Sequence, residues 1–212
     1  MLDFQKQFIQ YSLDCGVLKF GKFELKSGRT SPYFFNTGLF NSGAQLAKLG
    51  QFYAQALIHS GIKVDVLYGS AYKGIPLVST ASIAYAQMQD SDIPFAFNRK
   101  EAKDHGEGGN LVGAPLKGNV LILDDVITAG TSVRESVVII SAAGATPAGV
   151  LIALDRQEKG EHDISAIQEV STRFAMPVIS IIALEHIIEF IETDTAYVKN
   201  IAAIREYQQQ YG

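Results

Sequence analysis

Two adjacent acids follow an apolar stretch in the segment VLILDDVITAGTSV, residues 120–133. Asp124 and Asp125 stand where a buried strand would end, and acids in such a place are costly without a partner. Carboxylates only accept hydrogen bonds, so they suit sugar hydroxyls or a magnesium ion. The alternative, a simple turn with a helix cap, fits either acid taken singly but fits the whole segment less well.

The residues after these acids have the composition of an anion-binding turn. Small residues and Gly130 let backbone N–H groups converge, and the N-terminus of the helix that follows adds partial positive charge. Thr128, Thr131 and Ser132 add hydroxyl donors. We therefore expect a phosphate monoester here, beside the acids, in a pocket of the size of a ribose 5-phosphate.

Three competing motifs are absent from the sequence. A P-loop needs G-x-x-x-x-G-K-[ST], but in GSAYKGIP, residues 69–76, Ile-Pro follows the second glycine. No G-x-G-x-x-G follows an expected strand, so the dinucleotide-binding fingerprint is missing. The segment GTSVR, residues 130–134, lacks the final glycine of a nucleophile elbow.

Cationic side chains stand in three further segments. Lys73 lies in a glycine-bearing turn after an expected strand, although a lone lysine is usually a solvated surface residue. Residues 99–116 are long, polar and glycine-rich, and on composition alone they indicate a mobile, charged surface loop. Arg156 follows another apolar stretch, and a guanidinium suits a carboxylate or a carbonyl.

Apolar stretches alternate with helical patterns along the chain, which predicts a parallel sheet covered by helices on both faces. Asp3 is the expected cap of a first helix, which Cys15–Gly16 ends, and residues 17–36 favour short strands or a hairpin. The expected strands are 64–68, 94–98, 119–124, 148–154 and 178–183. The expected helices are 42–60, 77–89, 131–143, 164–174 and much of the tail 184–212. Ligands bind outside the carboxyl ends of such strands, so all the segments above meet at one edge.

Composition narrows the class of protein. The chain has 212 residues, 47% of them hydrophobic, which is enough for a full core and argues against disorder. The net charge of −4 argues against a general nucleic-acid-binding surface. Cys15 is the single cysteine, so no internal disulfide or thiolate zinc site is expected, and a reducing cytoplasmic setting fits. No apolar run approaches the ~20 residues of a membrane span.

Several segments together carry a resemblance to a known family. Residues 120–132 are similar to the phosphoribosyl-pyrophosphate signature of the type I phosphoribosyltransferases. FELKSGR (23–29), SPYFF (31–35), YKG (72–74) and NRKEAKDHGEG (98–108) resemble the orotate phosphoribosyltransferases within that family. The resemblance covers nearly the whole chain in order, and the motif positions match without a departure, Ser132 standing where Ala would serve equally.

The resemblance implies a fold, a reaction and an assembly. The fold is an α/β parallel-sheet phosphoribosyltransferase domain over 1–212, with an N-terminal helix and small hood (1–40), a core (62–183) and a flexible catalytic loop (99–116). The reaction transfers phosphoribose from phosphoribosyl pyrophosphate to orotate in pyrimidine (UMP) biosynthesis, giving orotidine 5′-monophosphate and pyrophosphate. It uses Mg²⁺ that is bound mainly through the donor and water. A homodimer would share its active sites, the loop of one subunit reaching the other.

The resemblance also implies residue roles. It places the catalytic roles on Lys103, His105, Asp124 and Asp125. Glu107 is a weak further candidate in the same loop. The substrate-binding residues would be Lys26, Phe34, Phe35, Tyr72, Lys73, Arg99, Lys100, Lys103, His105, Asp124, Asp125, Val126, Ile127, Thr128, Ala129, Gly130, Thr131, Ser132 and Arg156. From the sequence alone, Phe34 and Phe35 are better interpreted as core residues.

Two other functions stay open at this point. A regulator that binds phosphoribosyl pyrophosphate without turnover would keep the 120–132 segment, but it usually adds a DNA-binding module, and none is evident. A sister transferase for another nucleobase would differ in residues 23–35 and at Arg156.

Overall fold

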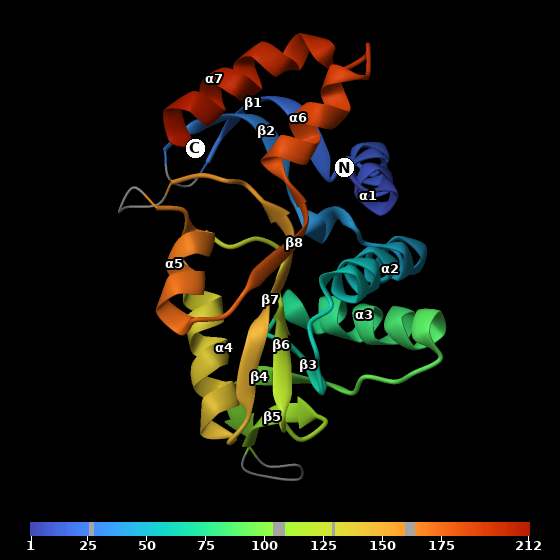
Figure 1. Cartoon of the computed structure of the whole chain (residues 1–212), viewed down its shortest axis with the longest axis vertical. Coiled ribbons are helices and arrows are strands. Elements are labelled where there is room, and N and C mark those ends of the chain that lie inside the picture. Colours follow the sequence, from blue (N-terminus) through green and yellow to red (C-terminus); the bar gives the residue numbers. More distant parts are fainter. Residues whose placement is uncertain (26–27, 104–108, 129, 160–163) are drawn as a thin grey trace.

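A central sheet runs through the computed structural model, which describes residues 1–25, 28–103, 109–128, 130–159 and 164–212, without the side chains of 102, 103 and 109. Within these residues the sheet has six strands in the order β5-β4-β3-β6-β7-β8 (Figure 1). All neighbouring pairs are parallel except β4 and β5, which are antiparallel. The strands are β3 (Val66–Gly69), β4 (Phe95–Lys103), β5 (Gly109–Gly113), β6 (Asn119–Leu123), β7 (Thr146–Asp155) and β8 (Val178–Ala183).

Helices cover both faces of this sheet, as the alternating pattern predicts. Helices α1 (Asp3–Asp14), α2 (Gly43–Ser60) and α3 (Gly74–Gln89) lie on one side of it. Helices α4 (Thr131–Ala142) and α5 (Ala166–Phe174) lie on the other (Figure 1). No helix in the described part of the chain is long and apolar enough to cross a membrane.

Alternate residues of the buried strands enter two separate cores, because successive side chains of a strand point to opposite faces. Leu67, Leu121 and Leu151 pack with the α1–α3 layer, in the same cluster as Phe8 and Phe52. Their neighbours along each strand pack with α4 and α5, in a cluster formed by Val66, Val120, Ile122, Val150, Val133, Ile140 and Val170. Burial on both faces explains the nearly continuous apolar stretches of these strands.

A second, two-stranded sheet lies beyond the carboxyl ends of the central strands. Strands β1 (Leu18–Glu24) and β2 (Thr30–Phe35) pair antiparallel, which confirms the expected hairpin in residues 17–36. Figure 1 shows this pair together with α6 (Leu184–Glu192) and α7 (Ile201–Tyr211) at one end of the molecule. Two short 3₁₀ turns, η1 (Thr37–Leu39) and η2 (Val198–Asn200), follow β2 and precede α7.

Helix ends agree with the sequence signals in some places and differ in others. Ser42 caps α2 by accepting a hydrogen bond from the Gln45 amide, and Gly61 ends it in the left-handed conformation. Helix α3 begins at Gly74, earlier than the expected Leu77, because Pro76 fits the first turn, where no intrahelical N–H bond is needed. Helix α1 starts at Asp3 itself, so Asp3 is not its cap.

The expectation of one irregular loop over residues 99–116 is wrong for the described residues. Strand β4 continues to Lys103, and β5 pairs with it through Ala96–Gly113, Phe97–Val112 and Asn98–Leu111. Strand β5 lies at the edge of the sheet, where charged residues are common because one side faces solvent, and β4 lies between it and β3. The apolar stretch 94–98 predicts only the first part of β4, and the polar residues after it give no strand signal. Residues 104–108 lie outside the described residues.

Candidate active site

Three neighbouring parallel strands end at the same edge of the sheet. Strand β3 ends at Gly69, β6 at Leu123 and β7 at Asp155, and β6 lies between the other two. The segments that follow them therefore meet at this edge, below the β1–β2 hairpin in the direction seen in Figure 1. We call residues 69–74 and 124–132 the strand-end turns.

The first strand-end turn is fixed by a close backbone contact. A Cβ added to Gly69 would stand 2.2 Å from the carbonyl oxygen of Gly74, and one added to Gly74 would stand 2.7 Å from the carbonyl carbon of Gly69. Both positions therefore require glycine. The Ala71 amide donates to Asn98 Oδ1 at 2.9 Å, which ties the turn to β4.

The second strand-end turn holds the two acids by backbone hydrogen bonds. Asp124 and Asp125 are only 7% and 6% exposed. The Asp125 amide donates to Asp124 Oδ1 at 2.9 Å, and the Val126 amide donates to Asp125 Oδ1 at 2.9 Å. The buried Tyr53 hydroxyl donates to the Asp124 carbonyl oxygen at 2.8 Å. These bonds fix the orientation of both carboxylates before any ligand arrives.

Lys73 joins the two strand-end turns. Its ammonium Nζ lies 2.6 Å from Asp125 Oδ2, although the lysine side chain is 63% exposed. The Thr37 hydroxyl donates to the same oxygen at 3.2 Å, from the 3₁₀ turn that follows β2. A second link is the 2.8 Å hydrogen bond between the hydroxyls of Ser70 and Ser132. A cation thus covers a buried carboxylate at the mouth of the site.

Burial also changes the acidity of Asp124. Desolvation, and then the charge of Asp125, raises the pKa of the Asp124 carboxyl from about 3.8 to about 6. The group is therefore mostly ionised at neutral pH but is costly to keep ionised. A hydrogen bond from a sugar hydroxyl, or a positive charge that develops nearby, would offset part of the cost of ionising Asp124. This carboxylate is therefore suited to accept from a sugar hydroxyl and to stabilise a cationic transition state.

The turn expected to bind a phosphate lies between the acids and α4. Gly130 adopts φ +64°, a left-handed conformation, and immediately precedes α4. Gly130 has no side chain to cap α4, so the first N–H groups of this helix are not used by a capping side chain and are suited to an anion. Thr128 and Thr131 are exposed, and Val126 and Ile127 are partly buried. Ala129 lies outside the described residues.

Arg156 belongs to a separate cluster beside the β1–β2 hairpin. Its Nε and Nη2 atoms lie 2.8 Å and 2.7 Å from Glu158 Oε1, and Nη2 donates to the Ser31 hydroxyl at 3.2 Å. The guanidinium carbon stands 4.4 Å from the centre of the Tyr33 ring. Arg29 approaches Glu158 from the other side, at 3.9 Å. We call Arg29, Ser31, Tyr33, Arg156 and Glu158 the arginine cluster.

The other predicted residues in the described part of the chain differ in their contacts. Phe34 and Phe35 are partly buried and their rings lie 5.4 Å from Phe23 and 6.3 Å from Phe8, so both make the packing contacts expected from the sequence alone. The exposed Tyr72 ring receives Lys100 Nζ at 5.0 Å. Arg99 lies on β4 beside Lys100.

Several predicted side chains lie outside the described part of the chain. Lys26, His105 and Glu107 lie outside the described residues. Lys103 is the last residue of β4, and its side chain is likewise outside them.

Four residues at this edge were missed by sequence reasoning. Three of them form hydrogen bonds with the strand-end turns: Thr37 from η1, Tyr53 from α2 and Asn98 from β4. Glu158 holds Arg156. Only Glu158 carried a local signal, an acid two residues from a predicted functional arginine. The others depend on contacts between residues far apart in the chain.

The donor set suits a magnesium ion that arrives with a ligand. Among the described residues, no group of three or more His, Cys, Asp or Glu side chains could hold a metal. Asp124 and Asp125 nonetheless offer carboxylate oxygens at the mouth of the site. Mg²⁺ is commonly bound in this way, by one or two carboxylates together with substrate phosphates and water.

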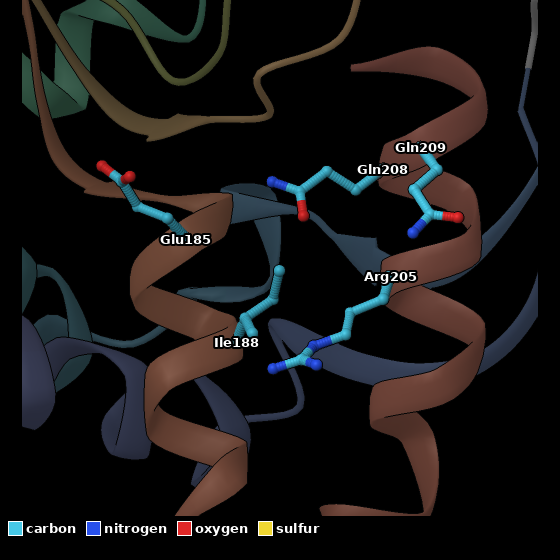
Figure 2. Close-up of a pocket in the computed structure, with 5 residues that line it drawn as sticks. All are labelled: Glu185, Ile188, Arg205, Gln208 and Gln209. Atoms are coloured by element: carbon cyan, nitrogen blue, oxygen red, sulfur yellow. The ribbon is translucent and has the colours of Figure 1, made fainter.

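A pocket elsewhere in the molecule has no such chemistry. It measures about 350 Å³ and lies between α6 and α7, where Ile188, Arg205 and Gln208 extend into the space between the helices (Figure 2). Arg205 is paired with Glu192, so its charge is already compensated. The functional site is therefore better placed at the strand ends.

Comparison with known proteins gives one consistent family. The phosphoribosyl transferase domain model matches residues 39–182. An orotate phosphoribosyltransferase from Pseudomonas aeruginosa is 59% identical over all 212 residues and over its own full length. One from Serratia proteamaculans is 58% identical over the same extent.

A solved structure agrees. The crystal structure of orotate phosphoribosyltransferase from Francisella tularensis superposes with a TM-score of 0.88 at 46% identity, covering 97% of this chain and 99% of that chain. The type I phosphoribosyltransferase fold expected from the sequence is confirmed. The chain belongs to the phosphoribosyl transferase domain family and, within it, to the orotate phosphoribosyltransferases.

Proposed function

We propose that this protein transfers the 5-phosphoribosyl group of phosphoribosyl pyrophosphate to orotate, a step in pyrimidine nucleotide (UMP) biosynthesis. The products are orotidine 5′-monophosphate and pyrophosphate. Full-length relatives at 58–59% identity support this assignment by their names. The observation that carries it is the buried Asp124–Asp125 pair under Lys73, beside an anion-binding turn at the same sheet edge.

The bonds that break and form in this reaction indicate a role for each part of the site. The bond between the anomeric carbon and the pyrophosphate oxygen breaks, and a bond from that carbon to a ring nitrogen of orotate forms as the nitrogen loses its proton. We expect an oxocarbenium-like transition state, as at other glycosidic carbons. Asp124 and Asp125 accept from the ribose hydroxyls and stabilise the positive charge on the sugar. The residues from Val126 to Ser132 hold the 5-phosphate.

Cationic side chains would neutralise the negative charge of the donor's pyrophosphate. Tyr72 and Lys73 belong to the first strand-end turn, and Lys100 lies against the Tyr72 ring. These three residues would bind the pyrophosphate. Lys103, with Arg99, would neutralise the leaving group, and His105 would carry a proton. When Mg²⁺ is bound, it screens the charge of the pyrophosphate; Asp124 and Asp125 are the residues that could hold it.

The remaining roles rest on resemblance. Arg156 would bind the carboxylate of orotate, Phe34 and Phe35 would face its ring, and Lys26 would lie between base and pyrophosphate. We also propose a cytoplasmic homodimer in which the 99–116 segment of one subunit completes the site of the other. Residues 1–40 would supply the N-terminal helix and the hood elements beside the core at 62–183.

One assay tests the reaction. Protein, donor, Mg²⁺ and orotate are mixed, and the loss of orotate absorbance is followed. Turnover with uracil or a purine but not with orotate would select a sister transferase instead. Tight donor binding without any turnover would select a regulator.

Two variants test how the loop works. Lys103→Ala should lower kcat much more than it weakens donor binding, because its contact strengthens as the pyrophosphate leaves. Near-normal turnover would disprove the role of Lys103. Mixing Lys103→Ala subunits with Asp125→Asn subunits should restore part of the activity in heterodimers; no recovery would argue against shared sites.

A further inference from the structure

The arginine cluster joins three parts of the chain that are distant in sequence. Arg156 and Glu158 follow β7, Ser31 and Tyr33 belong to β2, and Arg29 precedes β2. Helix α7 closes the cluster from outside: the Arg29 guanidinium carbon lies 4.7 Å from the centre of the Tyr211 ring. The Lys159 amide also donates to the Tyr211 carbonyl oxygen at 2.6 Å. The orientation of these side chains is therefore set by tertiary packing.

Glu158 occupies one defined edge of the Arg156 guanidinium. A single oxygen, Oε1, lies 2.8 Å from Nε and 2.7 Å from Nη2. Nη2 also donates to Ser31, and the ring of Tyr33 covers one face of the guanidinium. A planar guanidinium held at one edge and one face has a fixed orientation. No hydrogen bond joins Nη1 to another described residue, and the buried Tyr207 hydroxyl beside this arginine is also unpartnered, so the Nη1 edge is the candidate ligand edge.

The charges in this cluster sum to one positive unit. The side chains of Arg156 and Glu158 are 14% and 16% exposed, so both are largely withdrawn from water. Two guanidinium groups, Arg29 and Arg156, face one carboxylate, Glu158. A buried cation is costly unless it is paired, and Glu158 reduces the uncompensated charge to a single unit. One carboxylate on a ligand would balance it.

We propose that Glu158 is a positioning residue for base recognition. It turns the free edge of Arg156 toward the base and limits the excess charge to what one carboxylate can neutralise. A base without a carboxylate would leave that partly buried charge without an anionic partner, so the Glu158–Arg156 pair determines selectivity for an acidic base. This inference rests on the proposed role of Arg156 in binding orotate.

Steady-state kinetics of Glu158→Ala, Glu158→Gln and Arg156→Lys test the inference. Glu158→Ala should raise the KM for orotate about tenfold, the scale of one lost charge-assisted hydrogen bond, and leave the KM for the donor unchanged. Glu158→Gln should fall between wild type and Glu158→Ala, because its amide oxygen can still accept from Arg156. Glu192→Ala, which removes a surface partner of Arg205 on α6, is the matched control and should change neither KM.

A second readout separates positioning from general damage. The ratio of kcat/KM for orotate to that for uracil should fall about tenfold in Glu158→Ala, because only orotate uses the oriented arginine. A structural defect alone would lower both values together. If Glu158→Ala fails to fold, Glu158→Gln retains the shape of the side chain and gives the same comparison.

The outcomes separate this inference from the proposed function. An unchanged orotate KM in Glu158→Ala, or an equal rise in both KM values, overturns the role of Glu158 while the enzyme remains an orotate transferase. An unchanged orotate KM in Arg156→Lys overturns the role of Arg156 and this inference with it. A wild-type protein that does not turn over orotate overturns the proposed function itself.

Discussion

The strand-end turns and the arginine cluster are built in different ways. Each link that sets the shape of the strand-end turns has a backbone atom on at least one side: Gly69 contacts Gly74, amides bind the carboxylates of Asp124 and Asp125, and Tyr53 donates to a carbonyl oxygen. Side chains hold the arginine cluster, through ion pairs and a stacked ring. A backbone contact does not change when a neighbouring side chain is substituted, whereas a side-chain contact can be lost or replaced. The part that would bind the sugar phosphate is thus less adjustable than the part that would select the base.

Four predictions test this contrast, and the first removes a charge from the strand-end turns. Asp125→Asn keeps the shape of the side chain but loses the anion that faces Lys73 and would stabilise the sugar cation. We expect kcat/KM for the donor to fall about 10²–10³-fold, the usual cost of losing a main transition-state contact. The thermal midpoint, measured in parallel, should move by only a few degrees. A loss below tenfold would contradict the central role of this acid.

The second prediction adds a methyl group where two backbones meet. Gly69→Ala places a Cβ 2.2 Å from the Gly74 carbonyl oxygen, so the turn must shift. We expect the free energy of unfolding to fall by about 3 kcal/mol, the upper range of overpacking effects. Urea denaturation measures it. Gly43→Ala is the control, because no atom lies within 4 Å of the added Cβ and a helix position favours alanine. Equal effects at the two positions would show that the close contact is not rigid.

The third prediction concerns the pH dependence of stability. Burial raises the pKa of Asp124 to about 6 in the folded protein, above the ordinary value of 3.8. Between these values the folded state keeps a proton that the unfolded chain has lost, so stability decreases as pH rises and the loss is complete above pH 6. A shift of about two units corresponds to about 3 kcal/mol.

A variant isolates this contribution. Asp124→Asn cannot titrate and its Oδ1 can still accept from the Asp125 amide, so its unfolding free energy should lack this fall between pH 4 and pH 7. At pH 8 it should be more stable than wild type yet less active. Urea denaturation across the pH range measures the effect, and parallel curves for the two proteins would rule out Asp124 as the cause.

The fourth prediction tests a side chain that joins the two regions. Thr37 follows β2, which also carries Ser31 and Tyr33, and donates to Asp125 Oδ2. Thr37→Val removes the hydroxyl at nearly constant volume and should lower kcat/KM for the donor about fivefold, the scale of one neutral hydrogen bond of ~1 kcal/mol. Thr37→Ser restores the hydroxyl and should recover most of the activity. If Thr37→Ser is as inactive as Thr37→Val, Thr37 acts through packing and not through its hydroxyl.

Sequence patterns predicted the features that depend on residues close together in the chain. The buried strands and their helices are visible as apolar stretches and helical spacing, and the segment 120–132 contains both the acids and the turn proposed to bind phosphate in one run. The strand predicted at 94–98 is the first part of β4, but its continuation to Lys103 and the edge strand β5 were missed because their charged and glycine residues resemble a loop. Thr37, Tyr53 and Glu158 act through hydrogen bonds and ion pairs with partners brought near by folding, and nothing in their own neighbourhood marks the first two.

The ion pair between Lys73 and Asp125 has a consequence for how the two halves of the donor bind. In the proposed mode of binding, pyrophosphate would draw Lys73 away from the carboxylate, and a ribose hydroxyl would use that carboxylate oxygen only once the lysine had moved. Binding of either half of the donor would therefore separate Lys73 from Asp125 and make binding of the other half more favourable. Ribose 5-phosphate and pyrophosphate, added as separate molecules, should bind with positive cooperativity, each increasing the affinity for the other by the same factor.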